Sequence, residues 1–545
     1  MSRILLVTQS TRSAGEFRRP WVGMLYRRYV ARYRRQVACA ASRLARDGDL
    51  TVLAARELVE PATLPSGVDV RYYDEESFKV ESNELAELAR HLEAHCWPSS
   101  EPDPELSYGG VWLPDVLAVA RGLVLRMEVA EPLGAVERVW QETGPARLVL
   151  LSDASTAERV ARLLARRDGR PVAIAAPGFI WSRVYDVGHR ALFPREERRR
   201  VQNFLHYPRR VAPRPAAADR RFLFVTCRPR HHFVVDPLVA AVRAAGGEAH
   251  VVATPTPERD LESHLETLET AGIPWNYLSD FLPKRDALAL VRRYRPVFEG
   301  TWRRVEQDPD FARGVEWHGL ALLEIARPLL RDSVERSLLA AVLFQEAAMR
   351  AIEAIRPTAV VITSNRRHAE RALALAAHAA GVPCLLFSGA LIMGRERSLL
   401  FDVGDRMLVI GEHLKERVVA EQGVASSHIS VVGDPRSNAA RLIPATELRA
   451  QVFADFSLAP GKPLLVFLSK YVSLLFSPQE KVAYYRTMIG ALPDLGRPHV
   501  VVKVHPNENL DLLRGQVRQW GWPEAILTKE YDIHRLWPWR TRQSW

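Results

Sequence analysis

The sequence predicts an α/β protein with parallel strands that belong to more than one folding unit. Two observations point to this class: short apolar runs recur along the chain, and stretches with the apolar spacing of a helix separate several of them. The third observation is length: 545 residues are too many for one hydrophobic core, since a domain holds roughly 100–200 residues. We therefore expect three parts.

The first part, residues 1–210, is expected to be an additional N-terminal α/β domain of unassigned role. Its first strand is Ile4–Val7. Further strands are predicted at Leu50–Ala54, Val68–Tyr72, Leu148–Leu151 and Val172–Ala175. A helical pattern over Ala157–Arg166 lies between the last two strands, whereas Ala94–Pro114 is predicted to be an irregular, proline-containing insertion.

A basic and aromatic stretch follows the first strand. Trp21, Leu25, Tyr29 and Tyr33 recur at helical spacing among several arginines. We favour a first helix that packs this aromatic stripe on the sheet and leaves the arginines in water. The alternative is a helix that faces a membrane surface or a polyphosphate.

The second part, residues 221–400, follows a proline-containing linker at Tyr207–Arg220, where proline disfavours both helix and sheet. Its strands are predicted to begin at Arg221 and to include His250–Ala253, Thr358–Thr363 and Pro383–Phe387. Its helices are predicted at Asp236–Ala245, Glu258–Ala271, Arg313–Leu330, Ser333–Ile355 and Glu370–Ala380.

The third part, residues 401–545, begins with a strand–helix–strand unit over Asp405–Arg436. Leu414, Val418 and Val419 share one helical face, and Gly423 ends the helix because glycine accepts a positive φ. Further elements are predicted at Pro463–Leu468, Pro478–Ala491, His499–Val504, Leu510–Trp520 and Ala525–Thr528, before a last helix beginning at Asp532–Leu536.

Polar residues with phosphate-binding chemistry follow the ends of three strands in this third part. They are Gly433–Arg436, Ser469-Lys470 and Lys503–Glu508. The carboxyl ends of parallel strands share one edge of a sheet, where backbone amides, hydroxyls and basic groups suit a pyrophosphate. Each segment alone is a common turn, so the expectation rests on the three together.

The order of these motifs, GEHLKERVVAEQGVASSHISVVGDPRSN, then LSK, then VVVKVHPNE, resembles the second half of GT-B glycosyltransferases. It is most similar to those of bacterial capsule and surface-polysaccharide biosynthesis, with CDP-glycerol glycerophosphotransferases and UDP-N-acetylglucosamine 2-epimerases as relatives. The resemblance implies a GT-B-like pair of Rossmann-type domains: an acceptor domain at 221–400 and a donor domain at 401–545. It implies donor-binding residues at Gly411, Gly433, Arg436, Ser469, Lys470, Lys503, His505 and Asn507.

The resemblance stops before the fold of such a donor domain would be complete. After Leu536 the sequence WPWRTRQSW has no periodicity, so a frameshifted or truncated reading frame is expected. A missing strand would leave a sheet edge exposed.

The acceptor side needs a carboxylate or histidine that can serve as a general base. Ser364, Asn365, Arg367 and His368 follow a predicted strand, and His368, Glu299 and His318 are the candidates for the base. The sequence does not choose among them. No metal-binding motif stands out and no cofactor is expected, since amides and basic groups can stabilise a departing nucleotide phosphate.

Composition indicates the cellular compartment and the kinds of partner to expect. The four cysteines lie far apart, which argues against a disulfide framework or structural zinc. The predicted location is the cytoplasm, because no apolar run reaches the roughly 20 residues of a membrane span. The net charge of +11 suits a nucleotide-carrying substrate, an acidic membrane surface or a polyanion, or is only an arginine bias.

Three functional hypotheses follow. The first is a glycosyltransferase that moves a sugar or polyol phosphate from a nucleotide-activated donor to a saccharide or lipid-linked acceptor, with no nucleic-acid partner. The second is a sugar-nucleotide 2-epimerase on the same fold. The third is a non-catalytic scaffold or remnant, with peripheral contact to the inner face of the membrane as an open alternative.

Overall fold

The computed structural model divides into two compact units, Met1–Val431 and Val432–Trp545, and each is described by itself. The residues described are 2–9, 20–73, 75–76, 82–95, 97, 103–152, 155–176, 201–202, 204–205, 220–226, 232–254, 259–365, 367–388, 404–435, 444–471, 478–496, 498–505, 508–531 and 536. Within these, no helix combines the length and the apolar character needed to cross a bilayer.

The first unit contains a five-stranded sheet in which every pairing is parallel. In spatial order its strands are β3 (Asp69–Tyr72), β2 (Gly48–Ala54), β1 (Ser2–Val7), β6 (Arg147–Leu150) and β7 (Val172–Ile174). The chain adds β2 and β3 on one side of β1 and then returns to add β6 on the other side. The strand order therefore reverses between β1 and β6, the position at which open parallel sheets bind ligands.

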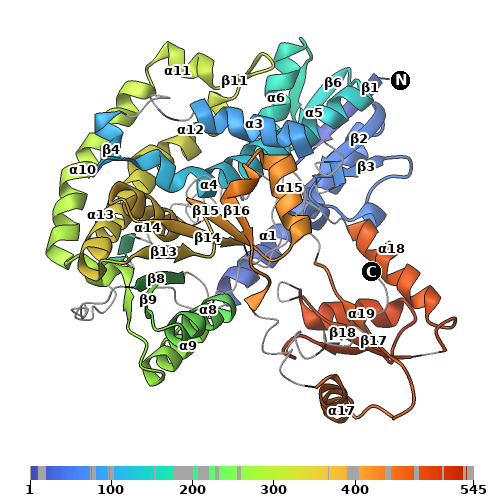
Figure 1. Cartoon of the computed structure of the whole chain (residues 1–545). Coiled ribbons are helices and arrows are strands. Elements are labelled where there is room, and N and C mark those ends of the chain that lie inside the picture. Colours follow the sequence, from blue (N-terminus) through green and yellow to red (C-terminus); the bar gives the residue numbers. More distant parts are fainter. Residues whose placement is uncertain are drawn as a thin grey trace. The chain divides into compact units, whose positions relative to one another are not determined.

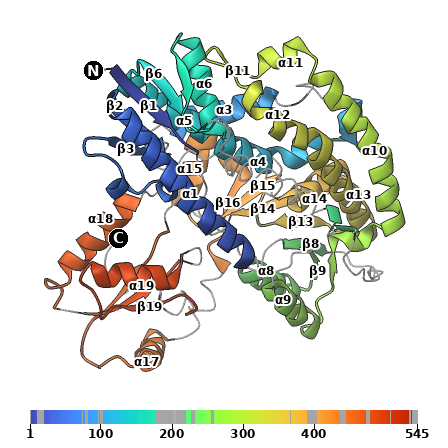
Figure 2. The same cartoon turned by 180° about the vertical axis from the view of Figure 1, so that it is seen from behind.

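Helix α1 (Pro20–Leu44) runs across this sheet (Figure 2). Tyr29 and Tyr33 of this helix are buried. Tyr29 donates its hydroxyl to Gln9 Oε1, and the Tyr33 hydroxyl accepts from Gln9 N at 2.8 Å. The interpretation of an aromatic stripe packed on the sheet is confirmed for these two residues, while the side chains of Trp21 and Leu25 lie outside the described residues.

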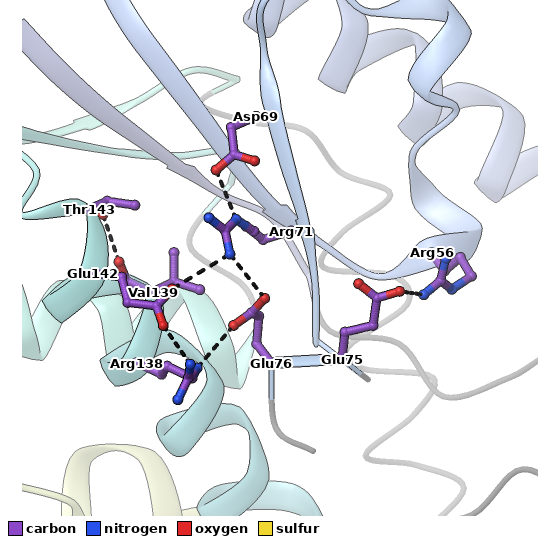
Figure 3. Close-up of polar contacts among 9 residues, drawn as sticks. All are labelled: Arg56, Asp69, Arg71, Glu75, Glu76, Arg138, Val139, Glu142 and Thr143. Atoms are coloured by element: carbon purple, nitrogen blue, oxygen red, sulfur yellow. Dashed lines mark hydrogen bonds and ion pairs between the residues drawn. The ribbon is translucent and has the colours of Figure 1, made fainter. Parts of the chain in front are cut away.

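Edge strand β3 is fastened to helix α5 (Glu131–Thr143) by a buried carboxylate (Figure 3). Glu76 is fully buried and lies 3.6 Å from Arg71 of β3 and 3.4 Å from Arg138 of α5. Both arginines also pair with Glu142, and Arg71 bonds to Asp69. Because a buried carboxylate needs compensating charge, Glu76 holds both arginines in place.

The first unit also contains a seven-stranded parallel sheet. In spatial order its strands are β10 (Trp275–Tyr277), β9 (Glu248–Ala253), β8 (Arg221–Thr226), β13 (Ala359–Ile362), β14 (Cys384–Ser388), β15 (Arg406–Val409) and β16 (Ile429–Val431). Helices α8 (His232–Ala244) and α9 (Arg259–Thr270) cover one face through Val239 and Leu265 (Figure 1). The other face belongs to the large core that also contains the first sheet.

The last two strands of this sheet correct one expectation. The predicted strand–helix–strand unit is present as β15, α15 (Glu412–Gln422) and β16, with Leu414 and Val418 buried and Gly423 at φ 68°. However, β15 pairs with β14, so the unit completes the sheet that begins with β8 instead of opening a new one. The boundary expected between residues 400 and 401 lies inside this sheet, and the compact units separate after Val431.

Two hairpins correct the expectations for the segments around them. Strands β4 (Ser107–Tyr108) and β5 (Val111–Trp112) pair antiparallel within the segment predicted to be irregular. Strands β11 (Glu316–Trp317) and β12 (Leu320–Ala321) interrupt the helix predicted over Arg313–Leu330. The two turn residues of each hairpin have positive φ, which breaks a helix and suits a tight hairpin turn.

Helices connect the hairpins to the sheets. In the first half they are α3 (Ser82–His95), α4 (Leu113–Leu125), a π-helical turn (Arg126–Ala130), α5 and, after β6, α6 (Thr156–Arg167). In the second half they are α10 (Lys284–Val305), α11 (Pro309–Gly314), α12 (Leu323–Asp332), a π-helical turn (Ser333–Ser337), α13 (Leu338–Ile355) and, after β13, α14 (His368–Ala379). The predicted α/β class is confirmed.

The second unit is built on a three-stranded parallel sheet in the order β17-β18-β19, with β17 and β18 labelled in Figure 1 and β19 in Figure 2. Its elements are α17 (Ala445–Asp455), β17 (Leu464–Leu468), α18 (Pro478–Ala491), β18 (His499–Lys503), α19 (Leu510–Gln519) and β19 (Ile526–Thr528). The predicted strands and the helices predicted at Pro478–Ala491 and Leu510–Trp520 are confirmed, whereas α17 was not predicted. The helix predicted to begin at Asp532–Leu536 lies, apart from Leu536, outside the described residues. Phe467, Tyr485, Val502 and Leu513 form the centre of its core.

Candidate functional site

The carboxyl edge of the sheet in the second unit gathers four of the predicted donor-binding residues. Ser469 and Lys470 follow β17, and Lys503 and His505 end or follow β18. The two strand ends are joined by a hydrogen bond of 3.0 Å from Ser469 N to Lys503 O. The parallel pairing of β17 and β18 therefore brings these residues to one edge, as the sequence predicts.

An aromatic contact adds Tyr471 to this edge. The rings of Tyr471 and His505 have centroids 4.3 Å apart with planes inclined by 39°. Both side chains are half-buried. Because the imidazole lies against a phenol ring, its orientation is restricted before any ligand arrives.

The third strand end supplies a further lysine. Lys503 Nζ donates to Lys529 O just after β19, and Lys529 Nζ donates to Glu508 O at 2.9 Å. These bonds tie the ends of β18 and β19 to the turn that contains Glu508. Two ammonium groups are thus held at the edge by backbone carbonyls, which leaves their positive charge uncompensated by those bonds.

A buried polar cluster lies next to this edge. Glu508 is almost completely buried and is paired with Lys481 of α18. Its Oε2, Ser469 Oγ and the Tyr485 hydroxyl are buried without hydrogen bonds to any group in the described residues. Burial raises the pKa of Tyr485; the nearby Ser469 hydroxyl lowers it and the Glu508 charge raises it further. The edge therefore has polar groups with unused bonding capacity in its interior.

Taken together, these residues favour binding of an anion. The described residues of this edge carry the basic side chains of Lys470, Lys481, Lys503 and Lys529, of which Lys481 is paired with the carboxylate of Glu508. Ammonium groups and hydroxyls bind phosphate oxygens well. No group of three or more potential metal ligands occurs in the described part of the chain.

The remaining predicted donor-binding residues are Gly411, Gly433, Arg436 and Asn507. Gly411 lies in the first unit, where it precedes α15. Gly433 has a φ of 79° and lies just after Val432, where the second unit begins. Arg436 and Asn507 lie outside the described residues, so their role stays a prediction.

In the first unit, the predicted acceptor residues follow β13 at the reversal point of the seven-stranded sheet, between β8 and β13. Asn365 and His368 are buried, and Ser364 and Arg367 are half-buried. The His368 ring stacks on Phe344 of α13, with centroids 6.0 Å apart. The buried, stacked ring of His368 therefore contributes to the packing of the first unit.

The other two candidates for a base lie elsewhere in the first unit. Glu299 is half-buried in the middle of α10, where its carbonyl accepts from Arg303 Nε at 3.2 Å. His318 is exposed in the turn between β11 and β12, has a φ of 46° and stacks on Trp317. The three candidates thus come from three separate elements, and catalysis by any one of them stays a prediction.

Sequence reasoning missed several residues of the edge in the second unit. Lys481 and Tyr485 belong to α18, and the helix turns them towards the end of β17. A spacing of four residues on a helix is the signal that could have paired them. Lys529 and the pairing of Glu508 with Lys481 were hidden, because only folding brings β18, β19 and α18 together.

Comparisons with known proteins add a likeness of fold. No protein-family model and no curated protein sequence matches the chain. Among solved structures, the UDP-GlcNAc 2-epimerase of Neisseria meningitidis bound to UDP-GlcNAc is similar, with 11% identity, a TM-score of 0.34, and coverage of 58% of this chain and 73% of that one. The UDP-GlcNAc 2-epimerase of Methanocaldococcus jannaschii matches at 10% identity and a TM-score of 0.34, covering 58% and 75%.

A third similar structure is MurG of Acinetobacter baumannii, with 12% identity, a TM-score of 0.28, and coverage of 56% of this chain and 65% of that one. The chain's own parallel sheets establish its α/β class.

Proposed function

We propose that the chain is a nucleotide-sugar-dependent enzyme of the glycosyltransferase type. Its second unit binds the diphosphate of the donor at the carboxyl edge of β17 and β18. The observation that carries this proposal is the convergence of Ser469, Lys470, Lys503 and His505 at one edge, joined by the Ser469 N to Lys503 O bond. The order of the same motifs along the sequence supports it.

The residues of the edge have the chemistry that departure of a nucleotide diphosphate requires. When the bond from the sugar to the diphosphate breaks, negative charge grows on the leaving phosphate oxygens. Lys470 and Lys503 stabilise this charge electrostatically, and His505 donates a hydrogen bond to it. Tyr471 holds the imidazole in the orientation that this bond needs. No metal ion is required for these roles.

The buried Lys481–Glu508 pair supports the residues of this edge from the interior of the second unit. It fixes the start of α18 against the turn after β18, so that Ser469 and His505 keep their positions. Because Ser469 and His505 are held in this way, they need not reorganise when negative charge develops on the phosphate. Preorganised groups of this kind supply much of the rate enhancement of enzymes.

On the acceptor side, we propose that the residues after β13 in the first unit bind the acceptor. His368 is the candidate base there, because a base must take a proton from the attacking hydroxyl, whereas the guanidinium of Arg367 stays protonated and cannot fill that role. In this proposal the donor is a nucleotide-activated sugar or polyol phosphate, and the acceptor is a saccharide or a lipid-linked saccharide of a cell-surface polymer.

The proposal is tested by calorimetric titration of the full-length chain with UDP-, CDP- and GDP-sugars. We expect one nucleotide series to bind, with the diphosphate as the common determinant. Lys503→Met should weaken binding about tenfold or more, since a hydrogen bond to a charged group is worth about 1.5–3 kcal/mol. Absence of binding by the folded chain to every member of the panel would contradict the proposal.

The matched control is Lys462→Met. Lys462 is an exposed lysine that precedes β17, so it lies at the opposite end of the same strand from Lys470. Its replacement removes the same charge from the second unit and should leave affinity within about twofold at moderate salt, because exposed charges are screened over roughly 10 Å. Product analysis with and without an acceptor then separates transfer from epimerisation of the donor alone.

A further inference from the structure

The two large sheets of the first unit share one topology. Strands β3-β2-β1-β6-β7 lie in the same spatial order, and follow one another along the chain in the same sequence, as β10-β9-β8-β13-β14. All of these pairings are parallel. Along the chain, a hairpin, a helix, a π-helical turn and a second helix follow one another between β3 and β6, and again between β10 and β13. In chain order these are the third and fourth strands of each set.

The sequences correspond as well. Segments 144–174 and 356–386 align without insertion or deletion, and the strand register agrees: Leu148 pairs with Val172, and Val360 pairs with Cys384. Identical residues in the two segments are Pro145/Pro357, Val149/Val361, Ser152/Ser364, Ala157/Ala369, Glu158/Glu370, Arg159/Arg371, Leu163/Leu375, Ala165/Ala377, Gly169/Gly381 and Pro171/Pro383. The first strands share the pattern Arg-x-Leu-x-Val-Thr at 3–8 and 221–226.

Unusual backbone conformations occur at corresponding positions. Gly144 and Arg356 both end the helix before the fourth strand in the left-handed region, with φ values of 51° and 49°. A left-handed arginine is uncommon, so its agreement with a glycine is informative. The hairpin turns agree too: Gly109-Gly110 has φ values of 57° and 77°, and His318-Gly319 has 46° and 75°.

A side-chain contact is also repeated. Arg3 Nη1 donates to Thr143 O at 3.2 Å, and Arg221 Nη1 donates to Ile355 O at 2.7 Å. In each case the first arginine of the first strand bonds to the last turn of the helix that precedes the fourth strand. The charge stabilises the carbonyl end of that helix.

Contacts between the two halves are reciprocal. Tyr108 of the first hairpin packs on Tyr294 of α10, with ring centroids 5.7 Å apart, and donates to Glu346 of α13 at 2.8 Å. Trp317, at the matching position of the second hairpin, packs on His91 of α3, with ring centroids 5.2 Å apart. Helices α3 and α10 are themselves counterparts, so each hairpin binds the same helix of the other half.

The helices after the hairpins repeat this exchange. Asp115 and Glu324 occupy matching positions at the start of α4 and α12. Arg371 of α14 donates through Nε to Asp115 O, and Arg166 of α6 pairs with Glu324 at 3.1 Å. Arg371 and Arg166 are not at matching positions, since Arg371 aligns with Arg159, but α6 and α14 are counterparts, so the contacts between helices again run in both directions.

We propose that residues 2–174 and 221–386 are two copies of one unit, and that each copy binds the other through the same surface. That surface consists of the hairpin with its following helix on one side, and of the counterparts α3/α10 and α6/α14 on the other. The arrangement resembles that of a symmetric dimer within one chain, because each element that contacts the other copy has a counterpart that makes the reverse contact. The first copy is therefore the built-in partner of the second.

The copies differ at the helix that follows the fourth strand. In the first copy Ser155 caps α6, and the buried carboxylate of Glu158 accepts from Ser152 N at 2.7 Å and from Ser155 N at 3.0 Å. In the second copy Arg367 stands at the cap position and makes no capping bond with its side chain. The copies thus share packing residues but differ at the N-terminus of this helix, which side chains cap in the first copy and which Arg367 does not cap in the second.

Hydrogen exchange of the full-length chain tests this reciprocity. We expect Tyr108→Ala to speed amide exchange in α10 of the second copy, and Trp317→Ala to speed it in α3 of the first copy, each by about tenfold or more. The control is Arg285→Ala at a side chain that is 90% exposed, which should change neither. Tyr108→Phe and Trp317→Phe keep an aromatic ring and provide milder variants should either alanine variant fail to fold.

A second measurement uses the same chain with a specific protease site inserted between residues 208 and 219. After cleavage of the folded protein we expect the halves to elute together in native buffer. Both alanine variants should lower the urea concentration at which the halves separate. Halves that part in native buffer, or exchange changes confined to the copy that carries the substitution, would overturn the proposal.

Discussion

The rings of Tyr471 and His505 lie with centroids 4.3 Å apart, although they come from the ends of two different strands. The contact exists because β17 and β18 pair in parallel, which places both carboxyl ends at one edge. It holds an imidazole at the same sheet edge as two lysines and a serine, the residues of the proposed phosphate site.

The first prediction concerns this ring contact. Tyr471→Leu should lower affinity for the nucleotide diphosphate about threefold to tenfold, because an aromatic pair is worth about 0.5–1.5 kcal/mol and His505 loses its fixed orientation. Tyr471→Phe keeps the ring and should bind like the wild type. Calorimetry on the three proteins measures this; equal loss in both variants would assign the effect to the hydroxyl instead.

The second prediction concerns the Lys481–Glu508 pair. The two side chains are 12% and 4% exposed, so Lys481→Met leaves a buried carboxylate without its partner and should destabilise the second unit by about 3–5 kcal/mol. The comparison is Asp511→Ala, which breaks a pair with Arg514 at a carboxylate that is 89% exposed and should cost less than about 1 kcal/mol. Hydrogen exchange in β17 and β18 reports both values, and similar costs for the two variants would contradict the buried character of the pair.

The third prediction is a pH dependence in the seven-stranded sheet. His250 of β9 is buried with its Nε2 3.1 Å from Asn276 Oδ1, and burial lowers its pKa to about 4 from an unfolded value near 6.5. Between these values the unfolded chain binds the proton and the folded chain does not, so stability falls as pH decreases from 6.5 to 4. The loss is about 3 kcal/mol at most.

Hydrogen exchange in β8 and β9 as a function of pH, corrected for intrinsic rates, measures this loss. His250→Gln removes the titrating group and should flatten the dependence between pH 6.5 and 4. His413→Gln, at an exposed histidine of α15, should leave the wild-type slope. A slope that is the same in the wild type and His250→Gln would exclude His250 as its source.

The fourth prediction concerns the ion cluster at β3. Arg138→Met removes one of the two cations beside the buried Glu76 and should cost about 1–3 kcal/mol, the penalty of an under-compensated buried group (Figure 3). Arg56→Met breaks the more exposed pair with Glu75 and should cost less than about 1 kcal/mol. The readout is exchange protection in β3 and α5, and protection that is equally reduced in both variants would argue against a special role of Glu76.

Much of the local structure could be predicted from the sequence, because local patterns determine it. Apolar runs such as Thr358–Thr363 and His499–Val504 are strands, and Gly423 ends its helix in the left-handed conformation. Sheet membership could not be predicted in the same way. Strand β15 joins β14 through long-range pairing, and an apolar run alone does not specify its neighbour.

The hairpins and the candidate site show the same limit. The residues around His318 do not indicate its left-handed conformation. The hairpin at β11–β12 was therefore predicted to be a helix. At the proposed phosphate site, strand ends identified Ser469, Lys470, Lys503 and His505. Lys481 and Tyr485 enter it from a helix, through packing that only the folded sheet defines.

The most direct test of the central claim is a calorimetric titration of UDP, CDP and GDP into three full-length proteins: the wild type, the double variant Lys503→Met/His505→Gln, and Lys462→Met. The account predicts that at least one nucleoside diphosphate binds the wild type and Lys462→Met with equal affinity, and binds the double variant at least about 30-fold more weakly, since two contacts to charge are lost. Equal affinity of the double variant and the wild type, in proteins with the same circular dichroism spectrum, would contradict it.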